Sequence, residues 1–215
     1  MNRYKTTFDT WNKIASLYEE VFMDMDLYND TYTFFCSELL QESPSVLEIG
    51  CGPGNITKHI VSKRPDCNIL GIDIAPNMIT LAKKNNPSAK FKVMDGRKIN
   101  TLTSKFDGII CGFYLPYLSK SDRFSFINDC AGLLNNNGVL YISFVEGDYK
   151  KSGYQTGSTG DQIYFYYHNL DDINQELIEH HFTVIKTIHK PYLKKDGTSE
   201  DHTILMAKKL ANTYK

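Results

Sequence analysis

The sequence predicts an α/β fold in which a mostly parallel β-sheet is covered by helices on both faces. From residue 45 onward, short apolar runs alternate with amphipathic stretches, which is typical of parallel strands joined by crossover helices. The runs at residues 46–49 and 69–72 are short and almost wholly apolar, as expected of central strands buried on both faces. A glycine-rich turn follows the first of these runs, where a parallel sheet places its ligands.

The predicted elements follow in chain order. Residues 1–44 are expected to be helical, with an apolar stripe that includes Trp11, Ala15 and Tyr18. Strands are predicted at 45–49, 68–72, 89–94, 106–112 and 138–145, with helices between them. Residues 146–162 are rich in Gly, Ser, Thr, Lys and Asp and lack apolar periodicity, so we expect a surface loop or insertion. The remaining elements are an extended aromatic piece at 164–168, a helix at 170–180, strands at 182–188 and 202–208, and a hairpin turn at 194–197.

Composition and charge exclude several classes of partner. The chain has 215 residues and a formal net charge of −1, and eight acidic residues oppose three basic ones in the first 42. No global positive field is present to hold nucleic acid. No apolar run approaches the roughly 18 residues that a membrane span needs, and none of the five cysteines forms a C-x-x-C pair. We therefore expect a soluble cytoplasmic protein that acts on a small molecule, with no membrane partner.

The glycine turn favours a cationic ligand without phosphates. It carries Gly50, Gly52 and Gly54 between a strand and a helix. A dinucleotide fingerprint requires a third glycine at position 55, which here is Asn55. Glu48 places an acid just before the turn, and proline at position 53 removes one backbone donor that could bind phosphate. Bound NAD is therefore disfavoured.

Two acidic residues follow the next two predicted strands. Asp73 ends the second strand, where a carboxylate can accept both hydroxyls of a ribose. Its alternative role is to cap the helix that opens at Pro76. Asp95 follows the third strand and could accept a hydrogen bond from an adenine amino group, or be a plain turn residue before Gly96.

In combination these motifs resemble the class I S-adenosylmethionine-dependent methyltransferases. The resemblance covers roughly residues 10–210 and rests on Glu48, the glycine turn, Asp73, Asp95 and the segments at 106–107 and 133–140. It implies a Rossmann-like three-layer sandwich with a seven-stranded sheet, in which the last two strands form a hairpin that brings in one antiparallel strand. It also implies S-adenosyl-L-methionine as the cofactor.

Carried over by position, the resemblance supplies a set of cofactor-binding residues. Gly50 and Gly52 are expected against the methionine part, Asp73 at the ribose, Asp95 at the adenine, and Met78 beside the ring. The full expected set is Glu48, Gly50, Cys51, Gly52, Gly54, Asp73, Ile74, Met78, Asp95, Gly96 and Phe113. The N-terminal stripe resembles the W-x-x-x-A-x-x-Y-[DE] entry of small-molecule members, in which Tyr18 helps to close the cofactor site. Core packing is the favoured interpretation for Trp11.

The acceptor side is less constrained by the sequence. The segment 112–117 follows the fourth strand but lacks the [DN]-P-P-[YFW] motif of enzymes that methylate base amino groups. We expect no bound metal, because no convincing Asp/Asn cluster is visible near this edge. His168 is a candidate general base, although a histidine just before a helix is often only a capping neighbour. Tyr18 is the second candidate catalytic residue.

The sequence is interpreted as a single methyltransferase domain over residues 1–215. Its expected parts are an N-terminal helical lid (1–44), a cofactor-binding core (45–145), a substrate-side insertion (146–163), and a C-terminal helix and strand hairpin (164–215). The expected activity is in-line methyl transfer to a small molecule by a monomer or homodimer. A non-catalytic S-adenosylmethionine-binding protein and, less favoured, a nicotinamide-dependent oxidoreductase stay open as alternatives.

Overall fold

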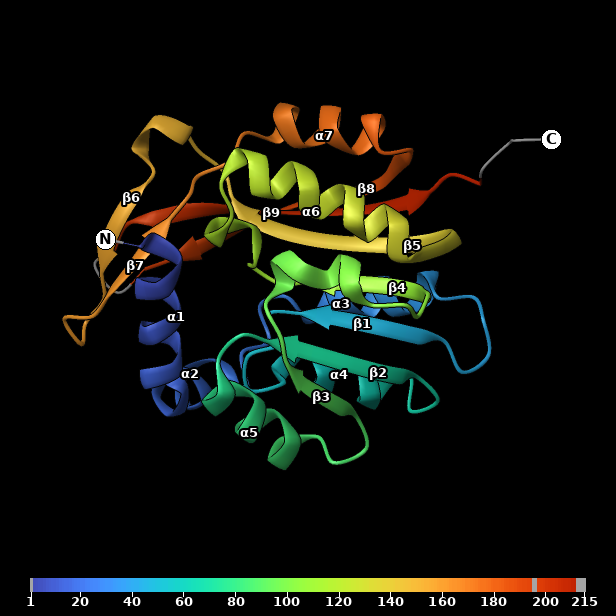
Figure 1. Ribbon diagram of the computed structural model, residues 1–215, viewed down its shortest axis with the longest axis horizontal. Helices are drawn as coiled ribbons and strands as arrows, with labels where there is room; N and C mark the ends of the chain where they lie inside the picture. Colours follow the sequence, from blue (N-terminus) through green and yellow to red (C-terminus); the bar gives the residue numbers. More distant parts are fainter. Residues whose placement is uncertain (1, 195–196, 212–215) are drawn as a thin grey trace.

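Seven strands form the central sheet, and helices cover both of its faces (Figure 1). The structure is a computed structural model that describes residues 2–194 and 197–211. The strands of this sheet are β1 (Ser45–Ile49), β2 (Asn68–Asp73), β3 (Lys90–Val93), β4 (Phe106–Cys111), β5 (Leu134–Val145), β8 (Phe182–Leu193) and β9 (Ser199–Lys209). They lie side by side in the order β3-β2-β1-β4-β5-β9-β8.

The sheet has the predicted strand directions. Strands β1 to β5 run parallel to one another, whereas β9 runs antiparallel to both β5 and β8. The predicted seven-stranded, mostly parallel sheet with one antiparallel strand is therefore confirmed. Leu47 of β1 lies beside Leu70 of β2 and Ile109 of β4, so apolar residues meet across the centre of the sheet. The five parallel strands end at one edge, which we call the carboxyl edge.

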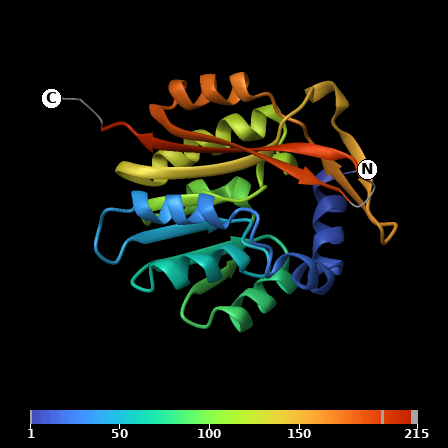
Figure 2. The same cartoon turned by 180° about the vertical axis from the view of Figure 1, so that it is seen from behind.

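Two pairs of helices bury the faces of the sheet. Helices α3 (Asn29–Glu38) and α4 (Asn55–Lys63) pack on one face, where Phe35 and Ile60 are fully buried (Figure 2). Helices α6 (Lys120–Leu133) and α7 (Leu170–Glu179) pack on the other. Side-chain caps fix where these two begin: Ser119 accepts from a backbone N–H of α6, and Asn169 from two of α7. Helix α5 (Pro76–Asn85) lies beside β2 and β3.

The N-terminal helices lie across the carboxyl edge. Helices α1 (Arg3–Lys13) and α2 (Ala15–Phe22) stand at the ends of the parallel strands (Figure 1). Helix α1 contacts β7, and α2 contacts α5. Together with α3 they confirm the helical prediction for the described part of residues 1–44. The helices therefore close the end of the sheet at which ligands of such folds bind.

The predicted loop at 146–162 is not wholly irregular, which corrects that expectation. It contains a 3₁₀ turn, η3 (Tyr149–Lys151), and the strand β6 (Gly153–Thr156), which pairs antiparallel with β7 (Gln162–Phe165). The rings of Tyr154 and Tyr164 meet edge to face at 5.1 Å across this small sheet. Strand β6 lies within the polar stretch, but its partner β7 lies at and beyond the end of that stretch. The local composition therefore did not indicate that the two segments pair.

The closing strands are longer than predicted. Alternation of half-buried and exposed residues extends β8 to Leu193, and β9 begins at Ser199. Residues 195 and 196 of the predicted hairpin turn at 194–197 lie outside the described residues. Within the part of the chain that the structure covers, no helix combines the length and apolar character needed to cross a membrane.

Candidate active site

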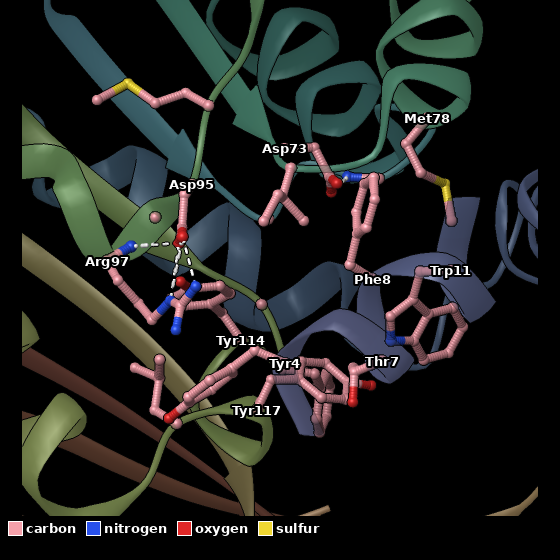
Figure 3. A pocket seen from close by; sticks show the side chains of 18 of the residues that line it. Tyr4, Thr7, Phe8, Trp11, Asp73, Met78, Asp95, Arg97, Tyr114 and Tyr117 are labelled. Atoms are coloured by element: carbon pink, nitrogen blue, oxygen red, sulfur yellow. Dashed lines mark hydrogen bonds and ion pairs between the residues drawn. The ribbon is translucent and has the colours of Figure 1, made fainter. Parts of the chain in front are cut away.

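A cavity lies at the carboxyl edge, between the ends of β1 to β4 and the N-terminal helices. Nine of the residues expected at the site line it, namely Tyr18, Gly50, Gly52, Asp73, Ile74, Met78, Asp95, Gly96 and Phe113. They come from segments between α2 and the end of β4, and Figure 3 shows the side chains of Asp73, Met78 and Asp95 around the same space. The lining combines apolar and aromatic side chains with a few polar groups, as in sites for small molecules.

The glycine turn forms the floor of the cavity. Gly50 and Gly52 have φ values of 68° and 52°, in the left-handed region that glycine adopts without steric cost. The backbone N–H groups of Gly50 and Cys51 both donate to the carbonyl of Ile72 at 2.8 and 3.0 Å, which joins the turn to β2. A ligand can thus approach the backbone at Gly50 and Gly52 without meeting a side chain of the turn.

Asp73 connects this turn to the next strand end. Its Oδ2 accepts from the N–H of Gly52 at 3.0 Å, and its Oδ1 accepts from the N–H of Ala75 at 2.8 Å. Burial raises the pKa of this carboxyl. The alternative role as a cap of α5 does not hold, because Ala75 is the N-cap and no side chain caps that helix. Figure 3 shows the carboxylate directed into the cavity, where its remaining lone pairs can accept hydroxyl groups.

Asp95 lies at the far side of the cavity and is paired with Arg97. The guanidinium Nη2 lies 2.6 Å from Oδ2 of Asp95, and the backbone N–H of Arg97 donates to Oδ1 at 2.9 Å. Burial alone would raise the pKa of Asp95, but the hydrogen bonds from Arg97 outweigh it and lower the pKa. The guanidinium also lies 3.9 Å from the ring centre of Tyr4. Asp95 is thus a charged acceptor whose capacity is partly used by Arg97.

Tyr18 and Trp11 form the wall contributed by α1 and α2. Their rings meet edge to face at 5.5 Å, and a Cβ on Gly52 would lie 3.6 Å from the ring of Tyr18. Burial raises the pKa of Tyr18 to about 12, and the charge of Asp73 adds to the shift. Tyr18 therefore offers a neutral hydroxyl. Trp11 lines the cavity and also packs against the core cluster of Ala15, Ala75 and Met78, so the expected core packing holds and the ring forms part of the cavity wall as well.

Glu48 lies beneath the glycine turn and does not line the cavity. Its carboxylate is fully buried and accepts from the hydroxyl of Thr57 through Oε2. Among the described residues, no group hydrogen-bonds its Oε1. Burial raises the pKa of Glu48 to about 8, and Asp73 adds to the rise. Near neutral pH this carboxyl therefore keeps its proton, and a cation above it would favour the ionised form.

Two other residues of the expected set also lie outside the lining. Cys51 is buried among Ile79, Ala82 and Phe91, and Gly54 is the left-handed N-cap of α4, against Asn86 and Ala82. They support the glycine turn from below. Cys51 and Gly54 therefore support the turn and do not face the cavity in which a ligand would bind.

The structure corrects the expectation that His168 is a general base. Its ring is fully buried, away from the cavity lining. Nδ1 lies 2.6 Å from Nη1 of Arg123, and Nε2 lies 2.8 Å from the carbonyl oxygen of Leu115. Because a guanidinium can only donate, Nδ1 accepts and Nε2 donates, which leaves no free lone pair. Burial lowers the pKa of His168 to about 4, and the charge of Arg123 reinforces this.

Several lining residues are not among the site residues expected from the sequence, although three of them belong to the segment 112–117 that was placed after the fourth strand. They are Tyr4, Thr7, Phe8, Met94, Arg97, Gly112, Tyr114, Tyr117 and Leu118. Tyr114 and Tyr117 lie shortly after the end of β4, so their position in the sequence already indicated that they are near the carboxyl edge. The residues of α1 gave only an amphipathic stripe, which cannot tell a core from a cavity wall. Within the described ranges no group of three or more His, Cys, Asp or Glu is arranged to hold a metal ion.

Comparison with known proteins shows which proteins this chain resembles. A family model described as "Methyltransferase domain" matches residues 46–138. A protein of invertebrate iridescent virus 6 that is described as a methyltransferase is 31% identical over 138 residues, which is 64% of this chain and 49% of that one. An uncharacterized methyltransferase of Alkaliphilus oremlandii is 25% identical over 161 residues, covering 70% and 73% of the two chains. The chain spans about half the length of the viral relative.

Solved structures agree on the fold. Magnesium protoporphyrin IX methyltransferase of Synechocystis superposes with a TM-score of 0.71 at 17% identity, covering 97% of this chain and 98% of that one. A methyltransferase of Methanosarcina mazei gives 0.69 at 21% identity, over 82% and 97%. Together with the sheet order, these likenesses show that the chain has the fold of these methyltransferases, and the family match covers the part of the chain from β1 to the start of β5.

Proposed function

We propose that this chain binds S-adenosylmethionine in the cavity at the carboxyl edge and transfers its methyl group to a small-molecule acceptor. The observation that carries the proposal is the Asp73 carboxylate, which is fixed by Gly52 and Ala75 and directed into the cavity. A carboxylate held in this way presents fixed acceptors to the two hydroxyls of a ribose. The structure of the Synechocystis relative was determined with S-adenosylmethionine bound.

The residues present fit each part of this molecule. Asp73 would hold the ribose, and Asp95 with Gly96 would hold the adenine at the end of β3. Gly50 and Gly52 would receive the methionine part, beneath Tyr18. The buried, incompletely paired Glu48 lies below the turn, and a cation bound above it would favour the ionised form of this carboxyl.

The chain's own groups would act by alignment and by exclusion of water. When bound, S-adenosylmethionine supplies an electrophilic methyl group on a sulfonium. Phe8, Trp11, Tyr18 and Tyr117 place aromatic rings around the cavity, and such rings favour a cation before transfer and tolerate the neutral product. Holding the acceptor in line with the donor can lower the barrier by about 7–11 kcal/mol. No proton-transfer residue is assigned, because His168 is removed from the cavity.

We propose further that α1 and α2 are a lid. Tyr4, Thr7, Phe8 and Trp11 of α1 line the cavity, and polar contacts hold the helix to other segments. Tyr4 donates to the carboxylate of Asp122, and the hydroxyl of Thr10 donates to the carbonyl of Gln162 at 2.6 Å. Few apolar residues of α1 are buried, so its attachment depends on such contacts and can open at modest cost.

A small-molecule acceptor is supported by the charge and by the name of one structural neighbour, magnesium protoporphyrin IX methyltransferase. The formal net charge is −1, which offers no general attraction to nucleic acid. Relatives include a carboxy-S-adenosyl-L-methionine synthase of Campylobacter hominis, 23% identical over 148 residues, and a malonyl-[acyl-carrier protein] O-methyltransferase of Acetivibrio thermocellus, 33% identical over 107. One name is that of a synthase and the other that of a methyltransferase, so the names share S-adenosylmethionine-related chemistry and point to no single substrate.

Calorimetric titration with S-adenosylmethionine, S-adenosylhomocysteine and NAD tests the cofactor. We expect S-adenosylmethionine and S-adenosylhomocysteine to bind and NAD not to bind. If NAD alone binds, the protein is better interpreted as a nicotinamide-dependent oxidoreductase. A metabolite extract incubated with methyl-labelled S-adenosylmethionine then tests the activity. Cofactor binding without any labelled product would favour the non-catalytic alternative.

A further inference from the structure

A second group of interacting side chains lies at the carboxyl edge, beyond the residues assigned to the cofactor. It consists of Tyr28, Phe113, Tyr192, Glu200 and His202. Tyr28 precedes α3, Phe113 follows β4, and the other three come from β8 and β9. His202 lies beside Val145, the last residue of β5, which places the group at the same edge as the glycine turn. The end of β8 and the start of β9 reach the end of the molecule where α1 lies (Figure 2).

The order of the strands indicates which end of the bound cofactor would lie nearest to this group of five side chains. Asp95, Asp73 and the glycine turn follow β3, β2 and β1, which are consecutive in the sheet. The proposed adenine, ribose and methionine positions therefore run along the edge in that order. The next strand is β4, followed by Phe113, and the strands after it are β5 and β9. Phe113 thus stands at the boundary between the cofactor cavity and the acceptor side.

His202 is held from several directions. Its Nδ1 shares a hydrogen bond of 2.6 Å with the hydroxyl of Tyr28. Its ring is stacked on Tyr192, with centroids 4.8 Å apart and planes 10° apart. Nε2 lies 3.8 Å from a carboxylate oxygen of Glu200. The side chains of Tyr28 and His202 are both buried, so their hydrogen bond is shielded from competing water.

Phe113 is packed against both members of this pair. The ring centroids of Tyr28 and His202 lie 5.2 and 4.7 Å from that of Phe113. The φ of Phe113 is 53°, a left-handed value that is rare for a bulky residue and is maintained only where surroundings enforce it. Its N–H donates to the hydroxyl of Ser143 at 2.8 Å. The strained backbone and the two ring contacts together fix Phe113 where it lines the cavity.

We propose that Tyr28 and His202 are a positioning pair, which holds the ring of Phe113 against the methyl-bearing end of the bound cofactor. The pair acts through Phe113 and does not itself touch the cofactor. The inference rests on the proposed function, because it requires S-adenosylmethionine in the cavity. Its consequence is that the pair affects recognition of positive charge at the sulfur position and leaves recognition of the nucleoside unchanged.

Two ligands separate these effects without knowledge of the acceptor. S-adenosylhomocysteine is neutral at the sulfur position, whereas sinefungin carries an amine there that is cationic near neutral pH. We expect Tyr28→Phe and His202→Gln each to weaken sinefungin about three- to tenfold, because a displaced Phe113 ring loses its attraction for the cation. S-adenosylhomocysteine should bind both variants within about twofold of wild type, since the nucleoside contacts do not change.

Two further proteins sharpen the experiment. His189→Gln changes a histidine of the same hairpin that bonds to Thr203 and has no ring contact with Phe113, so both ligands should bind it as they bind wild type. In a Phe113→Ala background, adding Tyr28→Phe should cause no further loss of sinefungin affinity, because the intermediary is absent.

The outcomes distinguish the two proposals. Failure of wild type to bind S-adenosylhomocysteine would refute the proposed function. Normal binding of S-adenosylhomocysteine, with unchanged sinefungin affinity in both variants, would overturn the positioning pair alone. Equal weakening of both ligands would also overturn it, because that is the result of a merely structural role. Thermal melting checks that the variants fold, and if Tyr28→Phe does not fold, His202→Gln decides.

Discussion

The two halves of the carboxyl edge are built in different ways. In the half formed by the ends of β1, β2 and β3, the polar groups are fixed by partners close along the chain: Asp73 by Ala75 and by Gly52, 21 positions away, and Asp95 by Arg97. In the half formed by β4, β5 and β9, the hydrogen bond between Tyr28 and His202 joins residues 174 positions apart. The cofactor half is therefore specified by short motifs, whereas the acceptor half depends on the whole fold and can vary independently.

The largest expected effect concerns the frame of the acceptor half. The fully buried Arg123 pairs with Glu176 at 2.6 Å and also holds His168, which binds the carbonyl of Leu115 just after Phe113. Glu176→Ala leaves a buried cation without its partner, and we expect a loss of about 3–5 kcal/mol in the free energy of unfolding in urea. Lys120→Ala is the control, since the Lys120–Asp172 pair is exposed and its loss costs less than about 1 kcal/mol. If both variants lose the same small free energy of unfolding, the buried pair is no more important for stability than the exposed one.

The next effect tests the cofactor half. Asp73→Ala removes a charged acceptor from the proposed ribose position. Affinity for S-adenosylmethionine and S-adenosylhomocysteine should fall alike, by roughly 1.5–3 kcal/mol in calorimetric titration. Tyr28→Phe, in the other half, should leave S-adenosylhomocysteine binding unchanged. Wild-type affinity in the Asp73 variant would remove the ribose assignment.

Glu48 gives the cofactor half a pH dependence. Its pKa is about 8 in the folded chain, above the ordinary value of 4.5, so between these pH values the folded state keeps a proton that the unfolded state releases. Stability must therefore decrease as pH rises through this window, by at most about 1.4 kcal/mol per pH unit from this group. Glu48→Gln should flatten the decrease in urea unfolding at pH 5, 6.5 and 8. Parallel profiles for the two proteins would show that Glu48 is ionised throughout.

The smallest effect concerns the lid, which covers the cavity. We expect amide hydrogen exchange in residues 8–30 to slow when S-adenosylhomocysteine is added, because a filled cavity favours the closed position of α1 and α2. NAD at the same concentration is the control and should change nothing. Unchanged protection with S-adenosylhomocysteine would mean that these helices are permanently packed.

The contrast between the two halves also explains which parts of the site could be predicted from the sequence. The strand-end positions of Gly50, Asp73 and Asp95 followed from spacing, because a parallel sheet brings successive carboxyl ends to one edge. His168 and His202 could not be told apart in this way. Each is a buried histidine near the edge, but which one lies next to the cavity is decided by the insertion of β9 between β5 and β8.

Other misses have a similar physical cause. Arg97 lies two residues after Asp95, yet its role depends on the ring of Tyr4, which α1 brings across the edge. The pairing of β6 with β7 was missed because its partner lay beyond a polar stretch. Local patterns predicted the elements and the shared edge, whereas tertiary contacts between distant segments decided which side chains face the cavity.

The place of β9 also sets the order in which the protein can assemble during synthesis. The ribosome makes β9 after all the other strands, yet β9 lies between β5 and β8. Until it inserts, the edge of β5 is unpaired, and this strand carries a buried run from Gly138 to Val145 that can pair with other chains. Residues 45–111 can meanwhile form the cofactor half from contacts already made. Maturation of the acceptor half is thus a late folding step, and a chaperone that shields β5 would act in that interval.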